Sequence, residues 1–411
     1  MASIVVNGDT SGAVTLSAPA VAGTVTVTLP SANGTMLTTA SSTGISGSAI
    51  SSGTVAEAYG GTGTSVGYNG FKNRIINGAM VIDQRNAGAS VTPANGAYTL
   101  DRWQYEASQA SKFTVQQNAA SVTPPAGYKN YLGMTVASAV SVGAGDYFIL
   151  EQRLEGLNVY DLAWGTASAS SVTLSFWVRS SLTGTFSGGL ANSDYSRAYV
   201  FSYSISAANT WEQKSITIAG DTTGTWLTTN GIGIQLRFSL GAGSTYSASA
   251  GSWGTTVAWN VTGGQSVVGT SGATFYITGV QLEKGSTATS FDYRPYGTEF
   301  SLCQRYFQKS YNQSVVPGTA STTVGQIAIL ANNSTFGEFL QMRFPVTMRA
   351  SPTMVTFNPS SGTSGSIRNN TASTNVTASI NNSAESGLSN LDSALTSGSV
   401  FTLQYTASAE L

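Results

Sequence analysis

Residues 172–181 read VTLSFWVRSS, and their apolar side chains alternate with polar ones. A period of two is typical of a β-strand that turns one face towards a hydrophobic core. Two later runs, KSITIAG at 214–220 and GIGIQLRFSL at 231–240, show the same period. Glycine, asparagine and aspartate, which favour turns, recur between such runs. The pattern predicts a central domain built as a β-sandwich or jelly roll.

The composition extends the all-β prediction to the whole chain. Of the 411 residues, 9% are charged, whereas an ordinary soluble domain has about 25%. The abundant threonine, valine and tyrosine favour strands, and the 46 glycines favour turns. The segment FSLCQRYFQKS at 300–310 is the exception, because its spacing allows a short helix. A chain of this length predicts more than one folded unit.

Changes in composition along the chain predict three parts. Residues 1–68 form an extended β segment followed by a linker or stalk rich in glycine, serine and threonine. Residues 69–299, in which large aromatic and charged residues first appear together, form the central jelly-roll sandwich. Residues 300–411 form a smaller C-terminal β domain, in which the polar segment 361–387 is expected to supply exposed loops and hairpins.

The N-terminal part has little from which to build a core. Its first 70 residues contain two charged residues, Asp9 and Glu57, and no large aromatic residue before Tyr59. We therefore expect this part to fold by pairing with other copies of itself or with a partner protein.

Residue counts exclude several classes of function. The chain has no histidine, which excludes Ser-His-Asp and Cys-His nucleophilic sites and His-ligated zinc within it. Cys303 is the single cysteine, so it has no partner for an internal disulfide, and we expect it to be a small buried hydrophobe. The net charge of −1 gives no electrostatic reason to expect nucleic-acid binding.

The sequence also lacks the patterns of export, membrane insertion and cofactor binding. It has no signal-peptide pattern, and no apolar run approaches the ~18 residues that span a bilayer. Paired carboxylates remain the one general route to hydrolysis. Glu106 and Glu151 are among the few acids near the predicted jelly roll, and we expect most of these acids to be solvated or paired with an arginine such as Arg153 or Arg237. We predict no metal or cofactor and no enzymatic activity.

Tryptophans are candidates for contact with sugars, because an aromatic face stacks on the apolar face of a pyranose while nearby polar groups bind its hydroxyls. Trp177, in the alternating strand, is expected in the core, and Trp211 and Trp226 are expected to pack at sheet edges. Trp253 and Trp259 lie in a segment with few neighbouring hydrophobes, so they are candidates for exposure and glycan binding. Packing under a loop is an equal alternative for these two.

A second candidate group lies in the run ANSDYSRAY at 191–199. It consists of Asp194, Tyr195, Arg197 and Tyr199. Asp194 and Arg197 could together bind the hydroxyls of a glycan. A surface ion pair or a turn is the alternative for these residues.

Other charged residues are expected to have structural roles. Asp101 and Arg102, in YTLDRW at 98–103, are expected to form a buried pair that locks the sheet. Asp292 and Arg294, in FDYRPY, invite the same explanation.

The sequence resembles phage tail-fibre and appendage proteins at several points. The stretch GDTSGAVTLSAPAVAGTVTVTLPSANGTMLTT at 8–39, with GGTGT at 60–64, looks like their N-terminal and linker segments. The run NRIINGAMVIDQRNAG at 73–88, followed by YTLDRW, resembles the entry to a domain with a carbohydrate-binding-like jelly roll. The run ITGVQLEKGSTATSFDYRPYGTEFSLCQRYFQ at 277–308 resembles the exit from that domain, and FPVTMRASPTM at 344–354 resembles the segment that commonly follows.

The resemblance implies a structural protein of the phage virion, made in the bacterial cytoplasm and often a homotrimer. Its N-terminal segment would contact other virion proteins, and its usual role would be recognition of the host surface, here through a glycan. Multivalent adhesion suits this role, because linking weak sites raises avidity by roughly 100-fold or more. The alternative is a structural decoration or fibre of the capsid or tail that contacts other virion proteins and binds no glycan.

Overall fold

The structure is a computed structural model that describes residues 3–7, 13–17, 71–322, 325–331, 342–393 and 395–411. The chain divides into two compact units, Met1–Gly53 and Thr54–Leu411. In the first unit, β1 (Ser3–Asn7) and β2 (Ala13–Ser17) pair antiparallel, so this part contains short strands as expected. The predicted linker, the predicted pairing between copies and the boundary near residue 68 concern residues outside the described ranges.

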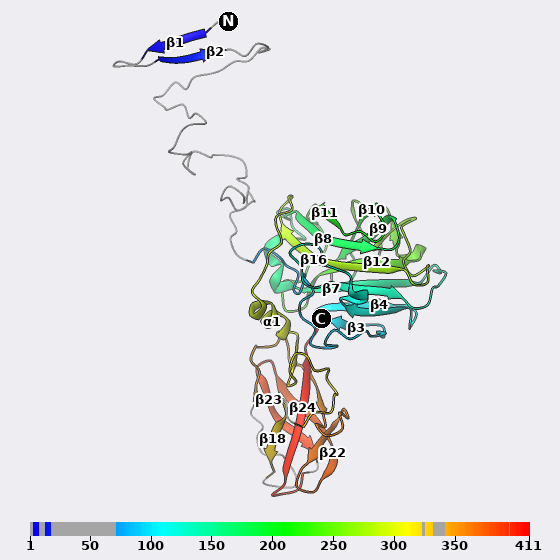
Figure 1. Cartoon of the computed structure of the whole chain (residues 1–411), viewed down its shortest axis with the longest axis vertical. Coiled ribbons are helices and arrows are strands. Elements are labelled where there is room, and N and C mark those ends of the chain that lie inside the picture. The colour runs from blue at the N-terminus through cyan, green and yellow to red at the C-terminus, as the bar shows by residue number, and fades with distance from the viewer. Residues whose placement is uncertain (1–2, 8–12, 18–70, 323–324, 332–341, 394) are drawn as a thin grey trace. The chain divides into compact units, whose positions relative to one another are not determined.

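Two antiparallel sheets form a β-sandwich in the second unit (Figure 1). The seven-stranded sheet, in the order β14-β10-β9-β12-β7-β4-β3, consists of β3 (Ala97–Leu100), β4 (Trp103–Ala107), β7 (Tyr147–Glu155), β9 (Gly184–Ala191), β10 (Ala198–Ile205), β12 (Ile232–Ala242) and β14 (Trp253–Gly254). The five-stranded sheet, in the order β11-β8-β16-β6-β5, consists of β5 (Phe113–Gln117), β6 (Leu132–Val136), β8 (Val172–Ser180), β11 (Glu212–Ile218) and β16 (Thr274–Lys284). The predicted all-β fold with a jelly-roll sandwich is confirmed.

Short elements connect the strands of the sandwich. They are the 3₁₀ helices η3 (Ala119–Ser121), η4 (Gly156–Asn158), η5 (Tyr160–Leu162) and η6 (Ser244–Tyr246), and a small parallel ladder of β13 (Ser247–Ala248) and β15 (Asn260–Val261). No helix in the described part of the chain has the length and hydrophobicity needed to cross a membrane.

The core of the sandwich lies between the two sheets. β8 contributes Leu174, Phe176 and Val178, which have no exposed surface, and β12 contributes Phe238, whose ring lies 5.1 Å from that of Phe176. The expectation that Trp177 belongs to this core is wrong. Because neighbouring side chains in a strand point to opposite faces, Trp177 lies on the outer face of β8, where it is half-buried.

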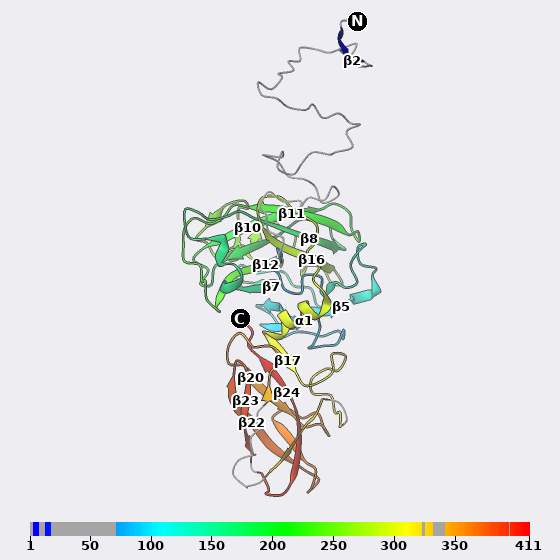
Figure 2. The same ribbon diagram turned by 90° about the vertical axis from the view of Figure 1, so that its left-hand side faces the viewer.

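A smaller group of elements follows the sandwich in the chain and has a hydrophobic cluster of its own (Figure 2). Its elements are α1 (Tyr296–Gln304), β17 (Phe307–Lys309), β18 (Ile327–Leu330), β19 (Met342–Arg343), β20 (Thr353–Phe357), β21 (Ser366–Asn369), β22 (Thr374–Ala384), β23 (Gly387–Ser393) and β24 (Val400–Ser408). The expected helix is present but begins at Tyr296, before the predicted range. The polar segment 361–387 contains a hairpin of β21 and β22, as expected, although Ile367 within it is buried. Cys303 has no exposed surface, as expected.

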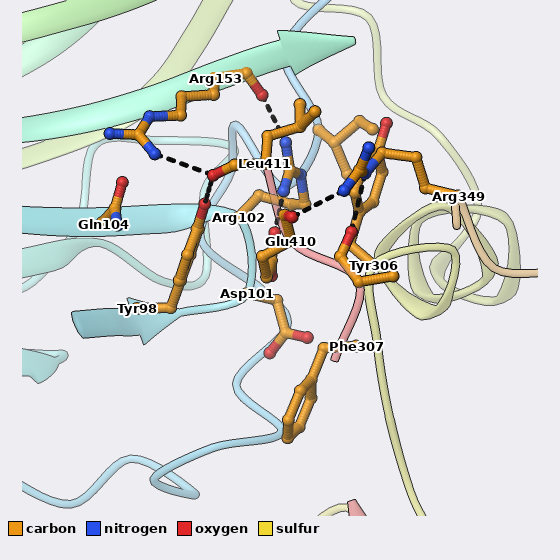
Figure 3. A network of polar contacts seen from close by, with 12 residues as sticks. Tyr98, Asp101, Arg102, Gln104, Arg153, Tyr306, Phe307, Arg349, Glu410 and Leu411 are labelled. Carbon is orange, nitrogen blue, oxygen red and sulfur yellow. Dashed lines mark hydrogen bonds and ion pairs between the residues drawn. The ribbon is translucent and has the colours of Figure 1, made fainter. Parts of the chain in front are cut away.

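Residues 410 and 411 contact the sandwich directly (Figure 3). The Glu410 carboxylate forms ion pairs with Arg102 and, at 2.7 Å, with Arg85. The main-chain oxygen of Leu411 accepts hydrogen bonds from Tyr98 Oη at 3.0 Å and from Arg153 Nη1 at 2.9 Å. These buried polar contacts join residues from opposite ends of the second unit.

The prediction that Asp101 and Arg102 pair with each other is wrong, because each has a different partner. Both residues are buried, but the Asp101 carboxylate accepts hydrogen bonds from the Gln84 main-chain and side-chain amides, at 2.7 and 2.6 Å, while Arg102 reaches Glu410. Asp101 and Arg102 form the turn between β3 and β4, where Arg102 has a φ of 70°, and each side chain meets a partner from another part of the chain. The Asp292–Arg294 pair is present, at 3.8 Å.

Candidate functional site

The outer face of the seven-stranded sheet carries polar and charged side chains from three adjacent strands, β12, β7 and β4. We call this group the polar sheet face; it consists of Gln104 and Glu106 from β4, Glu151 and Arg153 from β7, and Gln235 and Arg237 from β12. On each strand these residues alternate with core residues, which places them together on one face. The strand register aligns Gln104, Glu151 and Arg237 in one row across the sheet.

The charged groups of the polar sheet face are paired with one another. The Glu151 carboxylate has no exposed surface and lies 3.3 Å from Arg237 Nε and 3.4 Å from Arg153 Nε. Glu106 forms an ion pair with Arg153 and lies 3.6 Å from Arg237 Nη2. The prediction that these acids pair with Arg153 and Arg237 is confirmed. Glu106 and Arg153 remain the accessible members, with 17% and 18% of their side-chain surface exposed.

Burial, together with the neighbouring Glu151 carboxylate, raises the pKa of Glu106 to about 7, although Arg237 and Arg153 oppose the shift. Both carboxylates share the same two counter-charges, Arg153 and Arg237.

The raised pKa of Glu106 makes stability depend on pH. An acid whose pKa is higher in the folded state than its ordinary value of 4.5 stabilises the fold fully below pH 4.5, and this contribution is lost as the pH rises towards about 7. Glu106→Gln should remove this contribution, so the variant should gain stability relative to the wild type, on the order of 1 to 3 kcal/mol, between pH 4.5 and pH 8. Urea unfolding at both pH values measures the change. A difference between the two proteins that is constant with pH would contradict it. Burial also raises the pKa of Asp101, to about 6, but that residue is common to both proteins and cancels.

Aromatic side chains from two loops lie over the polar sheet face. The Arg237 guanidinium lies 4.4 Å from the ring centre of Tyr195 and 4.5 Å from that of Trp259. Tyr195 Oη donates a hydrogen bond to Gln235 Oε1 at 2.6 Å. Tyr246 stacks on Trp259 with the ring centres 4.6 Å apart. The absence of a side chain at Gly189 leaves room for Trp259, because a Cβ atom there would lie 3.0 Å from the Trp259 main chain.

Trp259 and Tyr195 are the two candidate residues that reach this face. Trp259 is only 5% exposed and packs between Tyr246 and Arg237, so of the two alternatives for this residue the structure shows packing. Tyr195 is half-buried, and its hydroxyl donates a hydrogen bond to the buried side chain of Gln235.

The other candidate residues lie elsewhere. Trp253 and Tyr199 pair at the sheet edge, with ring centres 5.3 Å apart, in a cluster that also holds Trp164 and Trp226. The expected edge packing of Trp226 is confirmed by this cluster.

The charged candidates have separate local roles. Asp194 is exposed and accepts hydrogen bonds from Ser196 within its own turn, which was the alternative reading for this residue. Arg197 forms a two-point ion pair with Asp221, at 2.7 and 2.8 Å. Trp211, expected at an edge, packs edge-on against Tyr131 at 5.5 Å.

Sequence reasoning missed most of the polar sheet face, although a signal for it was present. Polar residues at every second position of three otherwise apolar strands indicate one shared polar face once the strands are known to be neighbours. The residues missed as site members are Gln104, Glu106, Glu151, Arg153, Gln235, Arg237, Tyr246 and Tyr147, whose ring centre lies 5.5 Å from that of Tyr246. Among the described residues, no group of three or more cysteine, aspartate or glutamate side chains is placed to hold a metal ion.

Comparison with known proteins gives remote structural likenesses. No family model and no curated protein matches the sequence. The fold is similar to a putative sugar-binding protein from Bacteroides thetaiotaomicron, with 12% identity, 52% of this chain and all of that chain covered, and a TM-score of 0.31. TmCBM61 in complex with beta-1,4-galactotriose gives 12% identity, covering 52% of this chain and 99% of that one, with a TM-score of 0.28.

A phage protein is also among the similar structures. The enzymatically active domain of tailspike protein 4 from bacteriophage CBA120 gives 12% identity and a TM-score of 0.30 over 52% of this chain. The match spans about a fifth of that chain, 21%. The case for a function therefore depends on the chain's own residues.

Proposed function

We propose that this chain is a fibre or appendage subunit of a phage virion whose jelly roll binds a host-surface glycan at the polar sheet face. The observation that carries the proposal is the paired carboxylates and guanidinium groups on one face of a rigid sheet, with aromatic rings beside them. A sugar offers hydroxyls that both donate and accept hydrogen bonds, together with an apolar ring face. The polar sheet face supplies partners for each of these.

The accessible and buried residues of the face have different roles. Glu106 and Arg153 contact the sugar hydroxyls, because they keep exposed surface while their geometry is held by ion pairs. Glu151 and Arg237, which are almost fully buried, fix the positions of these two side chains. The half-buried rings of Tyr147 and Tyr246 offer the stacking surface beside them. Such preorganisation lowers the entropy lost on binding.

The sequence resemblance at the N-terminal, entry and exit stretches supports the placement on a virion. In this role the N-terminal segment contacts other virion proteins, and three or more copies of the jelly roll engage one surface together. Avidity then makes weak single-site affinity sufficient for adhesion.

The proposal is tested by Glu106→Gln on an array of bacterial surface polysaccharides. We expect binding to weaken by about tenfold or more, because the variant loses charge-assisted hydrogen bonds to sugar hydroxyls. Glu212→Gln is the matched control: Glu212 has the same 17% side-chain exposure and an ion pair with Lys214, but lies on β11 of the other sheet. Equal binding by the two variants would move the glycan site away from the polar sheet face. A wild-type protein that binds no glycan on the array would favour the structural decoration role.

A further inference from the structure

Three large apolar side chains are exposed around one hollow at the corner formed by η4, η5 and the start of the sandwich. They are Phe71, Leu157 and Tyr160, with 52%, 48% and 63% of their surface exposed. The hollow that they border has a volume of about 360 Å³. Exposed apolar groups gathered around a concavity mark binding sites more often than single exposed hydrophobes do.

The same hollow has polar groups in its wall. Arg74 Nη2 contacts the Asp161 carboxylate at 2.8 Å, and Arg74 Nη1 donates to the main-chain oxygen of Asn158 at 3.1 Å. Lys284 lies 3.7 Å from the same carboxylate, and Arg294, also in the wall, is paired with Glu299 at 3.2 Å. Arg74 and Lys284 share the Asp161 carboxylate, and Arg294 also lies 3.8 Å from Asp292, so three cations in and beside the wall face three carboxylates.

A second hollow, of about 180 Å³, is also lined by Tyr160. Its wall includes Trp164 and Trp226, whose rings meet edge to face with their centres 4.7 Å apart. Gly165 makes this packing possible, because a Cβ atom there would lie 3.2 Å from the Trp226 ring and 2.7 Å from the Gly224 carbonyl oxygen. Tyr160 borders both hollows, so a ligand that fills both must pass over its exposed ring.

We propose that the two hollows form a second saccharide site, separate from the polar sheet face, for an uncharged oligosaccharide of at least two sugar rings. One ring occupies the hollow of Arg74 and Asp161, which bond its hydroxyls, and another occupies the hollow of Trp164 and Trp226. Tyr160 stacks between them. The balanced charges of the wall favour a neutral sugar over an acidic one, since an acidic sugar would need a cation that is not already paired. This site does not depend on the polar sheet face, with which it shares none of its residues.

The test uses maltotriose, mannotriose and beta-1,4-galactotriose as neutral probes and trigalacturonic acid as the acidic one. Binding of each is measured by saturation-transfer NMR and titration calorimetry on the full chain. We expect at least one neutral probe to bind, and Tyr160→Ala to weaken it by roughly tenfold, the amount typical of a lost aromatic contact. Tyr296→Ala is the matched control, since Tyr296 is a tyrosine exposed to 56% on α1 that borders neither hollow. Phe71→Ala is a second variant at an exposed position.

The binding of the variants distinguishes the second saccharide site from the polar sheet face. Binding that survives Glu106→Gln but falls in Tyr160→Ala and Phe71→Ala establishes the second site, whether or not the polar sheet face binds a glycan. Equal binding by Tyr160→Ala and Tyr296→Ala overturns it. A stronger response to trigalacturonic acid, or no binding of any neutral probe by the wild type, also overturns it. Because Tyr160 is mostly exposed, the thermal midpoint of the variant should stay at the wild-type value, which separates lost binding from lost folding.

Discussion

Glu410→Ala should lower the free energy of unfolding by about 3 to 5 kcal/mol, because it leaves a buried guanidinium without its counter-charge. Arg102 keeps only 1% of its side-chain surface exposed, and Glu410 supplies its ion pair (Figure 3). The other side-chain contacts of Arg102 are a hydrogen bond to the main-chain oxygen of Arg153 and the ring of Tyr306, whose centre lies 3.6 Å from the guanidinium, and neither supplies a full counter-charge. Scanning calorimetry measures the effect as a lower midpoint and a smaller enthalpy for the first transition.

Glu385→Ala is the control for this prediction, since Glu385 lies in the same C-terminal domain but is exposed. It should change stability by less than about 0.5 kcal/mol. Glu410→Gln separates charge from hydrogen bonding, and it should fall between the two because the amide oxygen still accepts a hydrogen bond from Arg102. A Glu410→Ala protein as stable as the Glu385→Ala protein would show that the buried pair adds nothing to folding.

Arg237→Met should destabilise the sandwich by about 3 to 5 kcal/mol and abolish glycan binding at the polar sheet face. The Glu151 carboxylate, which has no exposed surface, would keep only Arg153 at 3.4 Å as a counter-charge. Tyr195 and Trp259 would also lose the guanidinium against which they pack. Urea unfolding and the glycan array measure the two effects.

The double variant Arg237→Met, Glu151→Leu tests the cause of the destabilisation. Replacing both partners of a buried pair by apolar side chains is often neutral or stabilising, so the double variant should recover most of the lost stability. It should not recover glycan binding, because Arg153 and Glu106 would lack their supporting charges. If stability remains as low as in Arg237→Met alone, the destabilisation comes from lost packing around Tyr195 and Trp259 instead.

The sequence was sufficient to predict the strands and their class. The alternation in β8, β11 and β12 reflects one buried face, and this local property survives in any sandwich. The sequence could not show which set of alternate side chains on β8 faces the core, since Phe176 and Trp177 are both apolar. Only the packing against Phe238 of the other sheet decides between them.

Contacts between distant residues were the part that could not be predicted. Arg102 and Glu410 are 308 residues apart, and no local pattern connects them. Trp259 was judged by the glycine and serine around it, but its neighbours in space are Gly189 and Arg237 from two other strands. The polar sheet face was missed for the same reason, because it exists only after β4, β7 and β12 are placed side by side.

The separation of the two faces of the seven-stranded sheet also affects how such a protein can diversify. Exchange of Glu106 or Arg153 alters the exposed chemistry of the sheet, while the core positions between them on each strand continue to specify the fold. The buried Glu151 and Arg237 lack this freedom, since a change in one leaves the other as an unpaired charge. At the proposed glycan site, new preferences are therefore easiest to evolve by substitution at the accessible pair, with Glu151 and Arg237 constrained to change together.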